Sequence, residues 1–223
     1  MLPPSPAAPL HCLYEDAYLL VLDKPAGLLC VPGKGPDKQD CLSARAQARW
    51  ADALVVHRLD MATSGLVLMA RSVEVQRALS LAFEQRLVHK SYEAVVAGMP
   101  QAQPGHWQLL DAPIAADWSQ RPLRHVGPEG KPSQTRWCVL GPWGDAAHGG
   151  GPATRLALEP VTGRTHQLRV HMQHLVHPML GDALYAPPAL AAAVPRLLLH
   201  ACQLRFAHPV TGELLDLHSP APF

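Results

Sequence analysis

The residue best placed to do chemistry is Asp60, in the segment His57–Gly65 between two apolar stretches. Thr63, Ser64 and Gly65 are turn formers, so the segment predicts a short loop held between two strands. A carboxylate in such a loop is rigidly presented and can act as an acid, a base or a nucleophile. The alternative is an aspartate that caps the turn through the Thr63 or Ser64 hydroxyl. The local pattern alone leaves both interpretations open.

A second candidate segment covers residues 163–171. Thr162 or Thr165 can cap a helix that starts here, which leaves Arg164 near the helix start and free to reach a carboxylate. From residue 155 to residue 205 the chain has five Arg and two acidic residues. This stretch is therefore the best candidate for an RNA-facing surface. The alternative is an ordinary solvated helix.

A run of histidines in the same part of the chain raises the possibility of a metal site: His166, His171, His174 and His177. A helical zinc site places two ligands four residues apart with a carboxylate nearby. Here the spacings are 5, 3 and 3, and no acidic residue lies between the histidines. The sequence therefore predicts no bound metal.

The elements that position these groups are mostly short strands. Apolar and alternating stretches predict strands at residues 11–14, 18–22, 54–57, 66–70, 91–97, 107–110, 135–140, 154–159, 197–206 and 213–218. Helices are expected at residues 41–50 and 165–175, and where Val75, Leu79, Phe83 and Leu87 recur every four residues. Many strands, few helices and no βαβ rhythm predict an α+β fold with a mixed, mostly antiparallel central sheet and flanking helices.

Residues 1–10 are proline-rich and predict a flexible N-terminal tail, and the glycine-rich stretch 141–152 predicts an exposed loop. No linker or internal repeat is evident. We therefore expect residues 11–223 to form a single domain.

The composition is that of a globular intracellular protein, with 48% hydrophobic and 17% charged residues and a net charge of +1. The five cysteines are scattered and contain no C-x-x-C pair, which argues against disulfides and structural zinc and favours a reducing cytoplasm. We expect no signal peptide and no membrane span. The chain has 14 Arg and 5 Lys, a bias that favours RNA contacts but that GC-rich codon usage explains equally well.

Six ordered segments resemble the motifs of the RluA family of pseudouridine synthases. They are Lys24-Pro25-x-Gly27, His57-Arg58-Leu59-Asp60-x-x-Thr63-Ser64-Gly65, Lys90-Ser91-Tyr92, Gly163-Arg164-Thr165-His166-Gln167-Leu168-Arg169-x-His171, His177-Pro178-x-x-Gly181-Asp182 and Leu198-Leu199-His200-Ala201. The resemblance spans roughly residues 11–220. It implies the pseudouridine synthase catalytic fold and an isomerase that converts uridine to pseudouridine in RNA without a cofactor.

The resemblance also implies roles for individual residues. Asp60 is the catalytic aspartate, Arg164 its ion-pair partner, Tyr92 the ring against the target base, and Leu199 an apolar residue lining the pocket. The target uridine must be flipped out of the folded RNA, and Arg58 is the candidate for filling the vacated space. Further residues expected to contact RNA are His57, Arg121, His166 and Arg169.

Residues 113–122 and the short chain are most similar to family members that act on stem-loops of 23S ribosomal RNA and a tRNA anticodon arm. We expect no separate N-terminal RNA-binding domain and a monomeric protein. Two alternatives from other functional classes remain. One is a non-catalytic RNA-binding or RNA-chaperone protein of the same fold, and the other is a metal-dependent RNA hydrolase built on the histidine run.

Overall fold

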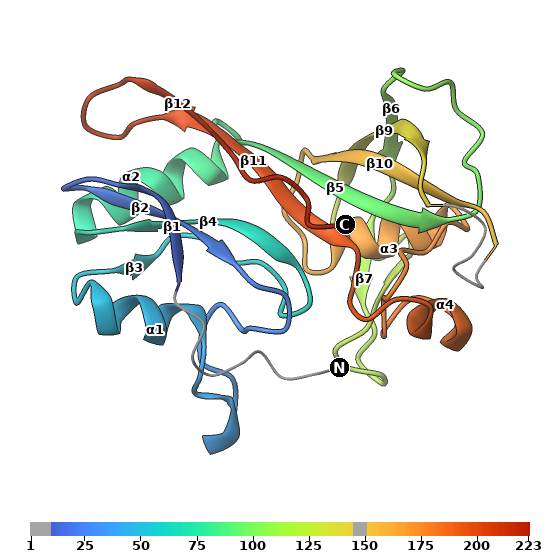
Figure 1. The fold of residues 1–223 in the computed structure, drawn as a ribbon, viewed down its shortest axis with the longest axis horizontal. Helices are drawn as coiled ribbons and strands as arrows, with labels where there is room; N and C mark the ends of the chain where they lie inside the picture. The colour runs from blue at the N-terminus through green and yellow to red at the C-terminus, as the bar shows by residue number, and fades with distance from the viewer. Residues whose placement is uncertain (1–9, 145–150) are drawn as a thin grey trace. The chain divides into compact units, whose positions relative to one another are not determined.

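The computed structural model describes residues 10–144 and 151–223 (Figure 1). Backbone contacts divide this chain into two compact units. Unit 1 comprises residues 10–90 and 200–222, and unit 2 comprises residues 91–199 and Phe223. The expectation that residues 11–223 form one domain stays a prediction.

Unit 1 is built on strands and helices from both ends of the chain. Its elements are β1 (His11–Glu15), β2 (Leu19–Lys24), the 3-10 helix η1 (Pro36–Lys38), α1 (Leu42–Arg49), β3 (Leu54–Val55), β4 (Ser64–Ala70), α2 (Val73–Glu84), β11 (Leu199–Ala207, from His200 onward) and β12 (Leu214–His218). The strand order is β1-β2-β4-β11, with β3 paired to β4 and β12 to β11. The β4–β11 pair is parallel and the other pairs are antiparallel.

The core of unit 1 lies where α2 packs on this sheet, with Val75 and Leu79 facing buried residues of β2, β4 and β11. The expected four-residue periodicity is confirmed as far as Phe83, but Leu87 lies outside the helix and is 65% exposed. The helix ends earlier because Arg86 adopts a left-handed conformation, with φ of 61°. The Leu87 N–H then donates to Ala82 O at 2.9 Å, which closes the helix end and turns the chain away.

Unit 2 contains the other elements: β5 (His89–Ala97, from Ser91 onward), β6 (Gln108–Asp111), β7 (Ile114–Ala116), β8 (Arg124–Val126), β9 (Gln134–Pro142), β10 (Ala153–Pro160), α3 (Gln167–His174) and α4 (Pro188–Ala192). Its antiparallel sheet has the order β5-β10-β9-β6, and β7 and β8 form a separate hairpin. Helix α3 lies against β8, β9 and β10. Val170 of α3 packs with Ile114 and Tyr185, which joins the hairpin to the helix.

Mixed, mostly antiparallel sheets with few helices confirm the expected α+β class. The expected strands and three helices all occur, with ends shifted by at most three residues. The sequence missed η1, β7, β8 and α4, each of three to five residues. The predicted tail lies outside the described residues except for Leu10, and so do residues 145–150 of the predicted loop, whose first residues instead end β9. No helix in residues 10–144 and 151–223 is long and apolar enough to cross a membrane.

Candidate active site

Asp60 lies in unit 1, in the loop between β3 and β4. The loop begins where β3 stops pairing with β4, after Val55, and ends where β11 pairs with β4 at Ser64. Strand β2 occupies the other edge of β4 along Gly65–Ala70. The loop therefore occupies the gap between two strands on one edge of β4, a central strand whose residues are all buried. This anchoring presents the loop rigidly.

The Asp60 side chain is half-buried, and its backbone closes a tight turn. The Thr63 N–H donates to Asp60 O at 3.1 Å. Thr63 Oγ1 is buried and has no hydrogen-bond partner in the described part of the chain. A turn cap through the Thr63 hydroxyl, one of the two alternatives for Asp60, is thus excluded. The hydrogen bond that closes the turn is thus made by main-chain groups.

A buried ammonium group holds the turn that follows Asp60. The Lys24 side chain is fully buried, and its Nζ donates to Pro25 O and Leu28 O, both at 2.8 Å, and to Met61 O at 3.1 Å. The Gly27 N–H also donates to Met61 O, at 2.8 Å. Polar groups buried in this way need such partners, so the bonds fix the turn against residues 25–28.

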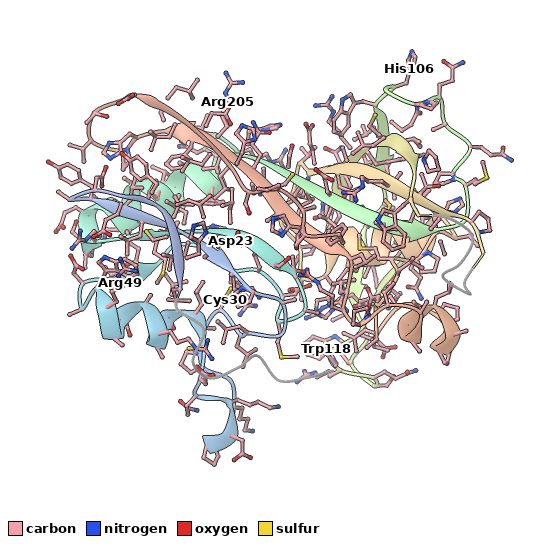
Figure 2. The ribbon with its side chains drawn as sticks, in the orientation of Figure 1. Asp23, Cys30, Arg49, His106, Trp118 and Arg205 are labelled. Atoms are coloured by element: carbon pink, nitrogen blue, oxygen red, sulfur yellow. The ribbon has the colours of Figure 1, made fainter. Side chains whose placement is uncertain are left out.

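The residues before Asp60 are held differently. Cys30, labelled in Figure 2, accepts the Leu59 N–H on its Sγ at 3.2 Å. Burial raises the pKa of the Cys30 thiol, so it stays a neutral, weak acceptor. Leu59 is buried and Arg58 is exposed. The loop therefore turns an arginine to solvent two residues before the carboxylate.

His57 supports the loop from within unit 1. Its Nε2 accepts the Leu68 N–H at 2.9 Å, and its ring stacks on Phe83 of α2 with centroids 4.5 Å apart. Burial, with a smaller contribution from the charge of Lys90, lowers the pKa of His57 to about 3. The imidazole is therefore neutral near pH 7. One ring nitrogen and one ring face are occupied, so the geometry does not favour the expected RNA contact of His57.

The lowered pKa of His57 predicts a loss of stability in acid. Between its unfolded pKa of about 6.5 and its folded pKa of about 3, the unfolded chain binds a proton that the folded chain does not. The contribution of His57 to the free energy of unfolding should therefore fall by up to about 1.4 kcal/mol for each pH unit below 6.5. Urea unfolding of wild type and His57→Gln, which keeps an acceptor but does not titrate, measures the effect. The wild type should lose more stability than the variant between pH 7 and pH 5. If the free energies of unfolding of the two proteins fell equally between pH 7 and pH 5, the lowered pKa of His57 would be contradicted.

Arg164 lies in unit 2, in the turn before α3. Its side chain is exposed, and its Nε donates to Pro132 O at 3.2 Å. The buried amide of Gln167 accepts the Arg164 N–H at 3.0 Å and the Thr162 hydroxyl at 2.7 Å. The same amide donates to Gln134 O at 2.9 Å. Gln167 thus ties the Arg164 turn to β9.

The cap predicted for this helix was wrong. Helix α3 begins at Gln167, and its N-cap residue is His166, in a left-handed conformation without a side-chain cap. The Thr162 hydroxyl instead bonds to the Gln167 side chain, and Thr165 is exposed. The sequence shows which residues can cap a helix, but here the Thr162 hydroxyl is engaged by a buried amide and no side chain caps α3.

His166 and Arg169, both expected to contact RNA, are engaged inside unit 2. His166 Nδ1 lies 2.6 Å from the Tyr185 hydroxyl. Arg169 is 4% exposed and forms a two-pronged ion pair with Asp182, with N–O distances of 2.8 and 2.6 Å. Asp182 also accepts the Leu184 and Tyr185 N–H groups. This enclosed pairing does not favour an RNA contact by Arg169.

The other predicted residues of unit 2 lie on three different elements. Tyr92 is half-buried on β5, opposite Leu158 of β10, and Leu199 is buried at the start of β11. Arg121 is exposed in the loop between β7 and β8, where its guanidinium lies 4.2 Å from the ring centre of Trp118, labelled in Figure 2. Trp118 is itself 72% exposed. The loop therefore presents an exposed cation–aromatic pair.

Comparison with known proteins decides the family. A sequence model described as RNA pseudouridylate synthase matches residues 18–174. The chain is 42% identical over 215 residues to the dual-specificity RNA pseudouridine synthase RluA of Escherichia coli K12, covering 96% of this chain and 94% of that protein. It is 43% identical to the protein of the same name from Vibrio vulnificus, covering 95% and 83%. The chain belongs to the RNA pseudouridylate synthase family.

Solved structures agree with this membership. The human RNA pseudouridylate synthase domain containing 1 superposes with a TM-score of 0.81 at 28% identity, covering 100% of this chain and 87% of that one. The human RNA pseudouridylate synthase domain containing 4 superposes with a TM-score of 0.71 at 24% identity, which shows a shared fold. The expected pseudouridine synthase fold and isomerase class are thus confirmed.

Within this pseudouridine synthase, the roles of the single site residues stay predictions. The match to the family model includes Asp60, Tyr92 and Arg164, and Leu199 lies beyond it. No role for Lys24 or Gln167 follows from the sequence, although both residues stand in motifs. A lysine next to a proline-glycine turn was the available signal, but its carbonyl partners could not be read from spacing.

The histidine run is not arranged as a metal site. No group of three or more His, Cys, Asp or Glu suited to a metal ion occurs among the residues that the structure describes. Both ring nitrogens of His171 are engaged, with Thr135 Oγ1 at 2.8 Å and Ala112 O at 3.0 Å. His177 Nδ1 lies 2.8 Å from Ala97 O. In this pseudouridine synthase, His171 and His177 are therefore engaged by hydrogen bonds within unit 2.

Proposed function

We propose that this chain isomerises uridine to pseudouridine in stem-loops of 23S ribosomal RNA and of a tRNA, with Asp60 as the catalytic carboxylate. One observation carries the proposal: in a chain of this family, the Asp60 loop is tied at both ends and at its turn. The relatives named dual-specificity RNA pseudouridine synthase support more than one RNA target. The resemblance of the motifs points to rRNA and tRNA.

The reaction explains the need for one carboxylate. The N1–C1′ glycosidic bond breaks, the uracil turns, and C5 bonds to C1′ while a proton leaves C5 and N1 gains one. No group is added and nothing is oxidised, so no cofactor is required. A single carboxylate serves as nucleophile or as acid and base. Glycosidases need a second carboxylate to manage water, whereas here water must be excluded to keep the base.

Three residues of unit 2 enter the proposal through the resemblance of the motifs. The resemblance gives Arg164, whose backbone turn Gln167 fixes, the role of ion-pair partner of Asp60. Tyr92 stacks on the target base and Leu199 supplies an apolar wall, which lets the uracil turn without leaving. The exposed guanidinium of Arg121, stacked on Trp118, suits contacts with RNA phosphates or bases. We also propose a cytoplasmic location, supported by the five free cysteines.

The test is conversion of a stem-loop transcript whose uridines carry tritium at C5. A pseudouridine synthase releases tritium and leaves the RNA chain intact, and EDTA does not change the rate. A metal-dependent hydrolase cleaves the chain and stops in EDTA. A non-catalytic RNA-binding protein releases no tritium and does not cleave the chain. This result would overturn the proposal. Running rRNA and tRNA stem-loops side by side tests the dual target.

Arg58 gives a prediction about base flipping. It is exposed and two residues from Asp60, so its side chain can fill the space that the flipped uridine leaves. Flipping costs a few kcal/mol in a duplex and less where the base is already unpaired. Arg58→Ala should therefore lower kcat/KM by about 10-fold or more on a stem-loop, and by less on a short unstructured RNA.

The matched control is Arg77→Ala, which removes an exposed arginine from α2 in the same unit. It should affect both RNAs little and equally. Equal losses on both RNAs in Arg58→Ala would show that Arg58 contributes charge alone.

A further inference from the structure

Four side chains of unit 1 form a chain of hydrogen bonds from β2 to the end of the Asp60 loop. Ser64 Oγ lies 2.7 Å from His200 Nδ1. His200 Nε2 lies 3.1 Å from Ser219 Oγ and 3.2 Å from Ser219 O. Ser219 Oγ donates to Asp23 Oδ2 at 2.6 Å. Asp23, labelled in Figure 2, stands on β2.

The partners set the direction of these bonds. The Ser219 hydroxyl proton goes to Asp23, so Ser219 Oγ accepts from His200, as its carbonyl oxygen must. His200 therefore carries a proton on Nε2. In a neutral imidazole Nδ1 is then an acceptor, and Ser64 donates to it. Each bond thus points from Ser64 toward Asp23.

This direction resembles that of a catalytic serine triad, but burial excludes a nucleophilic serine. Ser64 is 3% exposed, His200 1% and Ser219 4%. A nucleophile has to reach its substrate, whereas these side chains are buried. The chain of hydrogen bonds therefore has a structural role, which is to hold the residues it connects in place.

The position it sets is that of the loop carrying Asp60. Ser64 is the first residue of β4, four residues after Asp60, and is directly paired with His200 of β11. The next pair is Gly65 with Ala201, where the backbones come so close that a Cβ on Gly65 would lie 2.3 Å from Ala201 O. A shift of Ser64 would therefore shift the turn that ends at Thr63.

We propose that Ser64, His200, Ser219 and Asp23 act as positioning residues that hold the Asp60 carboxylate in its reactive place. This inference rests on the proposed function, because it assigns a task to groups that do not touch the RNA. Well-placed reacting groups lose up to about 100-fold in rate when displaced by about 1 Å. Loss of the hydrogen-bond chain should thus lower kcat and leave RNA binding intact.

The experiment compares Ser64→Ala and His200→Ala with His208→Ala. His208 is a matched control in the same unit, since it is 3% exposed and pairs with Asp16 at 2.9 Å, but it lies in the turn after β11. All three variants lose a buried hydrogen bond and should melt at lower temperature. Below the melting transition, Ser64→Ala and His200→Ala should lower kcat by about 10-fold or more with KM nearly unchanged. His208→Ala should keep the wild-type kcat.

A second measurement does not depend on activity. The Thr63 amide donates to Asp60 O, and the Gly27 amide donates to Met61 O in the same turn. Their hydrogen exchange should accelerate in Ser64→Ala and His200→Ala but not in His208→Ala. Ser64→Thr keeps the hydroxyl, so its kcat and its amide exchange should lie between those of wild type and those of Ser64→Ala.

The outcomes separate the inference from the function. Unchanged exchange at Thr63 and Gly27 overturns the inference even if the wild type makes pseudouridine. A kcat loss of the same size in His208→Ala, or a loss confined to KM, also overturns it. If the wild type makes no pseudouridine, the proposed function fails, and the exchange measurement still decides whether the hydrogen-bond chain positions the loop.

Discussion

Replacing Asp60 by asparagine should abolish isomerisation while leaving the fold and RNA binding intact. Asparagine has nearly the same shape, but its neutral amide cannot act as a nucleophile or transfer the proton. Removing such a group costs about 10⁴-fold or more in kcat in enzymes that depend on it. Single-turnover tritium release from a stem-loop, together with RNA affinity by filter binding, measures both quantities.

Asparagine also separates catalysis from turn formation. It forms tight turns as readily as aspartate does, and main-chain groups close this turn at Thr63. If Asp60 served the turn alone, Asp60→Asn would keep both its stability and its activity. A variant that melts like wild type and retains at least a tenth of the activity would therefore remove Asp60 from the chemistry.

The largest loss of stability is expected for Gly65→Ala. Gly65 has φ of 111°, and an added Cβ would lie 2.3, 2.6 and 2.8 Å from the backbone O, N and C of Ala201. Because backbone atoms cannot rotate away, β4 and β11 have to separate at this pair. We expect a loss of about 4 kcal/mol or more in the free energy of unfolding, together with loss of activity. Urea unfolding followed by circular dichroism measures the first effect.

Gly212→Ala is the matched control in the same unit. Gly212 also has a positive φ, of 74°, but no atom lies within 4 Å of its added Cβ. It should lose only the cost of backbone strain, about 1–2 kcal/mol. If the two variants lose the same free energy, the close approach of β4 to β11 does not contribute, and strain alone explains Gly65.

The sequence predicted the longer elements because their patterns are strong. Val75, Leu79 and Phe83 recur at helical spacing, and the stretch 91–97 has the length and composition of a strand. It failed at the end of α2, where Arg86 takes a left-handed conformation that glycine usually adopts. It also missed β7 and β8, because strands of three residues are too short to show a period.

The kind of candidate site could be predicted from the sequence, but the contacts that hold its residues in place could not. The motif containing Asp60 identified the loop, and the chain does belong to the predicted family. The groups that hold the loop were not predictable, because their partners are distant in sequence. His200 meets Ser64 across 136 residues, and Gln167 meets Gln134 across 33. For the same reason, charge counting predicted that Arg169 lies on a surface. In the structure Arg169 instead forms a buried ion pair with Asp182.

The most direct test of the central claim is to map pseudouridine in total RNA from cells that lack this protein. Defined uridines in stem-loops of 23S rRNA and of tRNA should lose the modification. Wild-type protein should restore it at the same positions, and Asp60→Asn, expressed to the same level, should not. If no position changes on loss of the protein, or if Asp60→Asn restores the modification, this chain is not a pseudouridine synthase that depends on Asp60.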